Sequence, residues 1–155
     1  MSGYVFRIFI APAAGAPMHE VKEVRAIPGK GLDGDRYKDG RGSWSKTREA
    51  ARDLSLISQE AIERANEGRE VPFTPEDTRR NIVVSLGVDA LNALLGRTFL
   101  IGDVVVYGAE LCDPCQRPSK LSGKPGFKEA FDGMGGLRVR VVFEGRITVR
   151  DSIFI

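Results

Sequence analysis

Short apolar runs, separated by turns rich in glycine, proline and polar residues, limit what this chain can fold into more than any other feature. The runs favour Val, Ile and Phe, as strands do, and no regular alternation of strand and helix links them. This pattern argues against a doubly wound parallel sheet. The runs with strand character span 4–10, 20–27, 53–57, 80–86 and 99–111, and a C-terminal hairpin is expected from 137–143 and 146–150. Because the edges of so many strands must be paired or covered, we predict a mostly β domain with a few short helices, closed or partly open as a β-barrel.

Only brief helices are expected between these strands. Ser58 is a suitable N-cap for a helix over 59–66, whose apolar residues fall on one face. Asp89 is expected to cap another short helix that ends at Gly96, and 127–131 can form one helical turn. Glycine and proline make other stretches irregular, namely 28–46 and 112–126.

Length and composition indicate one globular domain over 1–155. An apolar content of 42% is enough to build a core in a chain of 155 residues. The formal net charge of +2 gives no overall basic field, so nucleic acid is not an expected partner. No stretch approaches the roughly 20 apolar residues that span a bilayer, and the first residues do not resemble a secretory signal. We therefore expect a cytoplasmic protein without membrane contact.

The segment Leu111-Cys112-Asp113-Pro114-Cys115 contains both cysteines of the chain. It follows a predicted strand, and the polar residues after it are Gln116, Arg117, Ser119, Lys120 and Lys124. Cations near a cysteine favour the thiolate, which is the form that acts as a nucleophile or as a ligand to a soft metal. We therefore favour a functional role for Cys115. Cys112 continues the apolar end of the strand and can equally be a small core residue.

Two other interpretations of the cysteines have less support from the sequence. A structural zinc site needs four ligands, and the chain offers two cysteines and only His19, so zinc held within one chain is not expected. A dithiol redox pair normally has its first cysteine at the start of a helix, and Pro118 comes too soon for such a helix. The dithiol interpretation stays as a weaker alternative.

Several basic or polar residues could contact an anion, although the residues alone do not decide this. The glycine-rich stretch 28–37 includes Lys30 and Arg36, but it fits neither common nucleotide-binding spacing. It can equally be a solvated turn in which Asp35 and Arg36 pair with neighbours. Arg79-Arg80-Asn81 opens a predicted strand, and arginine can bind a phosphate through two parallel hydrogen bonds. Like Arg138, these arginines can also be solvated surface charges.

The order of the motifs along the chain resembles that of MOSC domains, the C-terminal domain of molybdenum cofactor sulfurases. The matching segments cover nearly the whole chain, and they are 31–36, 79–84, 94–103, 112–115 and 136–151. The length resembles that of the small stand-alone bacterial members of the family. The resemblance implies a β-rich, barrel-like fold of the MOSC type.

The resemblance also implies a set of site residues for molybdenum cofactor (molybdopterin). By position, Cys115 matches the cysteine that binds molybdenum or carries sulfur, so it is both the expected metal ligand and the expected catalytic residue. Arg79 and Asn81 match residues that contact the pterin or its phosphate in relatives. Asp35 and Arg36 match the family's Gly-Asp-Arg element. Charge and placement add Lys30 and Arg138 to the expected cofactor-binding residues.

Two functions follow from this resemblance. The first is an oxidoreductase in which molybdenum held by Cys115 reduces N-hydroxylated compounds, with an electron-transfer protein as partner. The second is a sulfur carrier or cofactor-delivery module that uses a Cys115 persulfide and receives sulfur from a cysteine desulfurase. The substrate, the electron donor and the oligomeric state are not indicated by the sequence.

Overall fold

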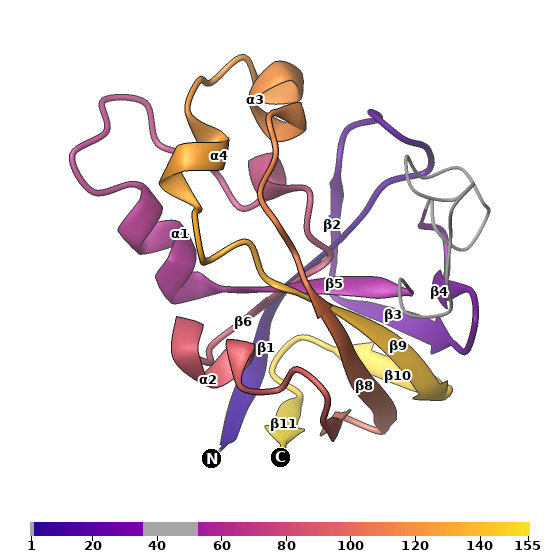
Figure 1. Cartoon of the computed structure of the whole chain (residues 1–155). Coiled ribbons are helices and arrows are strands. Elements are labelled where there is room, and N and C mark those ends of the chain that lie inside the picture. Colours follow the sequence, from indigo (N-terminus) through magenta and orange to yellow (C-terminus); the bar gives the residue numbers. More distant parts are fainter. Residues whose placement is uncertain (1, 36–52) are drawn as a thin grey trace.

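The computed structural model describes residues 2–35 and 53–155, and most of its strands form one curved sheet (Figure 1). In chain order these strands are β1 (Ser2–Ile10), β2 (His19–Val21), β5 (Leu54–Ser58), β6 (Ile82–Val84), β7 (Thr98–Ile101), β8 (Val104–Leu111), β9 (Leu137–Phe143) and β11 (Ser152–Phe154). Their order across the sheet is β11-β7-β8-β9-β5-β6-β1-β2. Only the β5–β6 pair is parallel among the described strand pairs of this sheet.

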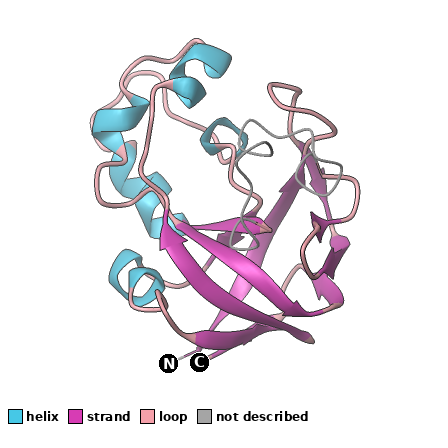
Figure 2. Cartoon of the chain, turned by 45° about the vertical axis from the view of Figure 1, so that its right-hand side comes forward, coloured by secondary structure: helices cyan, strands magenta, loops and turns pink. Residues whose placement is uncertain are grey.

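The sheet closes into a barrel because β1 pairs with β11 as well as with β6. Gly3 faces Ile153 and Tyr4 faces Ser152 across this closing pair. The N- and C-termini consequently lie side by side at one end of the barrel (Figure 2). The mostly β fold and the barrel predicted from the sequence are confirmed.

A second, smaller sheet contains β3 (Glu23–Ile27), β4 (Gly31–Leu32) and β10 (Gly145–Thr148), in the order β10-β3-β4. The predicted C-terminal hairpin is therefore wrong, since β9 pairs with β5 and β8 whereas β10 pairs with β3. After β9 the chain leaves the barrel at Glu144, which bonds to Arg25 of β3. The short strand β11, which closes the barrel, was not predicted.

Two apolar clusters fill the two sides of the barrel wall. The inner cluster includes Val5, Leu56 and Val139, all fully buried. The outer cluster lies between the wall and the helices, and it contains Phe9, Ile57, Val83, Phe73, Phe127 and Phe131. Inward and outward residues alternate along the central strands, as the pleat of a strand requires. The outer face of the barrel wall is therefore apolar where the helices pack on it.

Short helices cover this outer face, as Figure 2 shows. They are α1 (Gln59–Ala65), the 3-10 helix η3 (Glu76–Thr78), α2 (Val88–Asn92), α3 (Arg117–Ser122) and α4 (Phe127–Ala130). Ser58 caps α1 as predicted, because its side chain accepts a hydrogen bond from the Glu60 backbone N–H. Asp89 does not cap α2, which starts after Gly87; a carboxylate oxygen of Glu60 accepts from the Val88 N–H there. None of the described helices is both long and apolar enough to cross a membrane.

Candidate functional site

The two cysteines of the loop that follows β8 differ in their exposure to solvent. Cys112 is 4% exposed, and its backbone N–H donates to the Gly136 carbonyl at 2.8 Å. Cys115 is exposed, and both are free thiols. The sequence favoured Cys115 over Cys112 for chemistry, and the accessibility of the two thiols agrees with that preference. We call residues 112–115 the thiol loop.

The helix after the thiol loop corrects one sequence argument. Pro118 was expected to prevent a helix, but α3 includes it in its first turn. Proline is tolerated there because the first N–H groups of a helix have no partner within it. What weighs against a dithiol pair is instead the burial of Cys112, since thiol exchange requires access to the attacked sulfur.

The Gly135 backbone packs directly against the thiol loop. A Cβ built on Gly135 would lie 2.1 Å from the Cys112 carbonyl oxygen and 3.1 Å from the Pro114 ring. Real Cβ atoms essentially never come within 3.0 Å of a heavy atom outside their own residue and its chain neighbours, so only glycine fits here. Together with the bond from Cys112 to Gly136, this contact fixes the start of the loop on the segment 133–136.

Arg79 and Arg80 diverge although they are neighbours in sequence. Arg79 has a φ of 62°, a left-handed conformation that is uncommon outside glycine. Its Nη1 donates to the Ala16 carbonyl at 2.5 Å. Arg80 turns the other way, and its Nε donates to the Gly135 carbonyl at 2.7 Å. The start of β6 is thereby tied both to the 11–18 loop and to the segment beneath the thiol loop.

Asn81 is fully buried and anchors the barrel wall. Its Oδ1 accepts from the backbone N–H and the hydroxyl of Ser55 at 3.1 and 3.2 Å, and its Nδ2 donates to the Phe9 carbonyl at 3.1 Å. These bonds join β5, β6 and β1. The geometry gives Asn81 a positioning role, and its expected contact with a pterin stays a prediction.

The remaining expected residues are spread over the molecule. Asp35 is fully buried and accepts from the Ala11 N–H at 3.0 Å, so it fixes the chain after β1. Arg138 on β9 lies opposite Ser55, and its Nε is 3.5 Å from a Glu110 carboxylate oxygen. Lys30 is exposed in the turn between β3 and β4. Arg36 lies outside the described residues.

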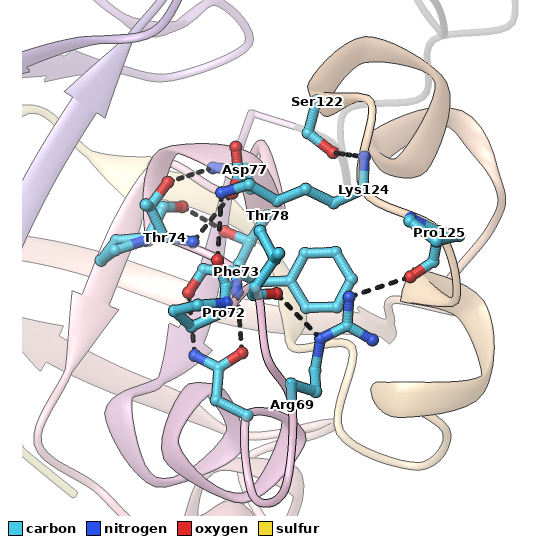
Figure 3. Close-up of polar contacts among 12 residues, drawn as sticks. Arg69, Pro72, Phe73, Thr74, Asp77, Thr78, Ser122, Lys124 and Pro125 are labelled. Atoms are coloured by element: carbon cyan, nitrogen blue, oxygen red, sulfur yellow. Dashed lines mark hydrogen bonds and ion pairs between the residues drawn. The ribbon is translucent and has the colours of Figure 1, made fainter.

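Helices α3 and α4 are tied to the segment 69–78, as Figure 3 shows. Lys124 Nζ lies 2.5 Å from an Asp77 carboxylate oxygen, and both side chains are mostly buried. Arg69 stacks on the Phe73 ring at 4.0 Å and donates to the Pro125 carbonyl at 3.0 Å. Lys124 was expected to supply positive charge to the thiols, but its partner Asp77 largely neutralises it.

A cavity of about 320 Å³ opens between the 11–18 loop, η3 and α3. Arg79, Met18 and Leu121 are among its lining residues, whereas Cys115 is not. Among the described residues, no group of three or more His, Cys, Asp or Glu could hold a metal ion. A metal at Cys115 would therefore need further ligands from a cofactor.

The structure is a closed β-barrel. Its candidate site has the thiol loop with the exposed Cys115, and two arginines, Arg79 and Arg80, just before β6. The family model for the MOSC domain matches residues 35–154. The chain belongs to the MOSC domain family, which is linked to molybdenum cofactor binding. The resemblance seen in the sequence is thereby confirmed.

Solved structures support the fold. The YuaD protein from Bacillus subtilis gives a TM-score of 0.80 at 19% identity, over 99% of this chain and 94% of that chain. YiiM from Geobacillus stearothermophilus gives 0.75 at 16% identity, over 98% and 74% of the two chains. YiiM from Escherichia coli gives 0.68 at 17% identity, over 99% and 69%. No curated protein sequence matches the chain.

Proposed function

We propose that this protein binds molybdenum cofactor, with the Cys115 thiolate as the protein's ligand to the metal. The observation that carries the proposal is the exposed Cys115 sulfur on a loop whose start is pinned by Gly135 and Gly136. A thiolate is a soft ligand of the kind that suits such metals. Family membership supplies the identity of the cofactor.

The residues around the thiol loop fit this group. Molybdenum cofactor carries its own sulfur ligands on the pterin, so a single protein thiolate suffices where no cluster of metal-binding side chains is present among the described residues. Its phosphate requires cations, and Arg79 and Arg80 stand at the start of β6. Arg79 also borders the cavity beside α3, the helix that begins just after Cys115.

Each residue has a separate task in this proposal. Cys115 binds the metal, Arg79 binds the anionic part of the cofactor, and Asn81 keeps β6 and β5 in register beneath it. Arg138 is one of the two arginines of β9, and it pairs with Ser55 of β5 across the wall. When bound, the cofactor supplies two-electron transfer of an oxygen atom, which suits the reduction of N-hydroxylated compounds with electrons from a partner protein.

A second role rests on the exposure of the same thiol. A sulfur carrier must present its cysteine to a cysteine desulfurase and then to an acceptor, and the exposed Cys115 meets this requirement. In that role Cys115 accepts sulfur as a persulfide, and the protein passes it on without turnover of its own.

The cofactor proposal is tested on protein purified from a molybdate-replete host. The pterin released from wild type, Cys115→Ala and Cys112→Ala is oxidised to its fluorescent form and measured. We expect pterin in wild type and Cys112→Ala and much less in Cys115→Ala. Equal pterin in all three proteins, or none in wild type, would refute the proposal.

The enzyme and the carrier differ in turnover. Loaded protein with a chemical electron donor should reduce an N-hydroxylated amidine repeatedly if it is the enzyme. Incubation with a cysteine desulfurase and cysteine, followed by mass spectrometry without reductant, should add one sulfur at Cys115 if it is the carrier.

A further inference from the structure

Arg80 is a nearly buried cation without a carboxylate partner. Only 9% of its surface is exposed. Its side chain donates to two backbone carbonyls, those of Gly135 at 2.7 Å and Thr78 at 3.4 Å. In the described parts of the chain no carboxylate pairs with it. A buried charge is costly unless another charge or a full set of hydrogen bonds compensates it.

Three more exposed arginines of the described residues have the carboxylate partner that Arg80 lacks. Arg7 pairs with Glu20, Arg25 with Glu144 and Arg146 with Glu23. All of these pairs are more exposed to solvent than Arg80. Arg80 is thus a buried arginine with no anion from the described residues, whereas these three more exposed arginines each have one.

Part of the Arg80 guanidinium is available to a ligand. A guanidinium has five N–H donors, and only Nε and Nη1 of Arg80 have acceptors. Among the described residues no fully buried side-chain nitrogen or oxygen lacks a partner, so Nη2 must reach solvent. The planar edge formed by Nη1 and Nη2 matches two oxygens of a phosphate.

The guanidinium lies beside the thiol loop. The carbonyl that Nε binds belongs to Gly135, whose Cα side is in contact with the Cys112 carbonyl and the Pro114 ring. Gly135 is thus the single residue between the Arg80 guanidinium and the thiol loop. The backbone on the other side of Arg80 is held by the bonds of Asn81, so the guanidinium is fixed in place.

We propose that Arg80 is a phosphate-binding residue of the Cys115 site, acting through the Nη1–Nη2 edge of its guanidinium. The inference rests on the proposed function for the link to the cofactor, because the phosphate bound in that case is the cofactor's own. The family resemblance pointed to Arg79 and Asn81 and not to Arg80. A bound phosphate would also be the counter-ion that Arg80 does not have among the described residues.

The test uses the full chain free of cofactor, with inorganic phosphate as the probe and chloride to keep ionic strength constant. The melting temperature of wild type, Arg80→Gln, Arg80→Lys and Arg146→Gln is followed as phosphate is added. We expect a saturable rise in wild type and in Arg146→Gln. In Arg80→Gln the affinity for phosphate should fall about tenfold or more, as for loss of a charge-assisted bond. Arg80→Lys should lie between them.

A purely structural role for Arg80 gives a different result. Arg80→Gln would then melt at a lower temperature in chloride, yet phosphate would raise its melting temperature as much as in wild type. That outcome, or the absence of a phosphate response in wild type, would overturn the proposal. If Arg80→Gln does not fold, the arginine Nε–H signals of ¹⁵N-labelled wild type replace it. The Arg80 signal, assigned with Arg80→Lys, should shift with phosphate, and a constant signal would overturn the proposal.

Failure of this inference is distinguishable from failure of the proposed function. The cofactor proposal depends on the difference in pterin content between wild type and Cys115→Ala. The Arg80 proposal depends on inorganic phosphate alone, in protein that holds no cofactor and has an intact Cys115.

Discussion

Asn81 and Ser55 lock two parallel strands together through their side chains. Asn81 Oδ1 accepts from both the N–H and the hydroxyl of Ser55, and the same hydroxyl accepts from the Asn81 N–H at 3.1 Å. Both residues are buried at the point where β5 and β6 begin to pair. This link holds the barrel wall beneath the candidate site.

Asn81→Ala should destabilise the protein by roughly 2–4 kcal/mol, because it leaves the buried Ser55 N–H and the Phe9 carbonyl without partners. Urea unfolding measures the change. Asn92→Ala is the matched control, since the Asn92 amide makes one exposed bond of 3.3 Å to Gly133 and should cost less than about 1 kcal/mol. Equal costs for the two variants would contradict the anchoring role of Asn81.

Gly135→Ala should disturb the thiol loop more than Gly133→Ala does. At Gly135 the new methyl group meets the Cys112 backbone, and overpacking of this kind typically costs about 1–3 kcal/mol or more. At Gly133 nothing lies within 4 Å, and the only cost is that of a left-handed φ, about 1–2 kcal/mol.

The rate of Cys115 alkylation separates these two effects. It should change in Gly135→Ala, because the loop must shift, and it should stay at the wild-type value in Gly133→Ala. An unchanged rate in both variants would show that Gly135 does not position the thiol.

Lys124→Met should loosen the contact between α3 and η3. The ion pair of Lys124 with Asp77 has side chains only 22% and 16% exposed, so loss of one partner leaves a poorly solvated charge and should cost roughly 1–3 kcal/mol. Arg25→Met is the control, because its partner Glu144 and Arg25 are 56% and 53% exposed and the expected cost is below about 1 kcal/mol. A double-mutant cycle with Asp77→Asn should show strong coupling, and additive effects would contradict the importance of the pair.

The pair of Arg7 and Glu20 should make a small, pH-dependent contribution to stability. The hydrogen bond from Arg7 holds the pKa of Glu20 below its usual value of 4.5. A lowered carboxyl pKa stabilises the fold above the unfolded value, and this contribution disappears as the pH falls through the lowered pKa. Both side chains are about a third or more exposed, so the effect should be a few tenths of a kcal/mol.

Unfolding of wild type and Glu20→Gln between neutral and acidic pH tests this point. The difference between the two proteins should be present near neutral pH and should vanish in acid. A difference that grows as the pH falls would contradict the assignment.

Much of the fold could be predicted from local pattern, and the errors arise from long-range contacts. Ser58 caps α1 as its residue type suggests, and β5 is shifted by one residue from the predicted 53–57, whereas β6 (Ile82–Val84) is shorter than the predicted 80–86. β10 pairs with β3, a segment more than a hundred residues earlier in the chain, and no local pattern reveals such a pairing. The sequence also led us to expect separate roles for Cys112 and Cys115, because one continues an apolar strand and the other does not.

The basic residues were harder to rank. Arg79, Arg80 and Arg138 look alike in sequence, and only the three-dimensional contacts distinguish them. Burial next to Gly135 marks Arg80, whereas Arg138 has Glu110 as a partner across β8 and β9. Burial of a charge depends on segments 55 residues apart in sequence and therefore leaves no local signal.

The molybdenum-to-protein ratio tests the central claim most directly. Wild type, Cys115→Ala and Cys112→Ala are purified side by side from a molybdate-replete host and analysed for metal, with circular dichroism to confirm that each is folded. The account predicts similar molybdenum in wild type and Cys112→Ala and its loss in folded Cys115→Ala. Molybdenum retained in Cys115→Ala at the wild-type ratio would contradict the role of Cys115 as the ligand.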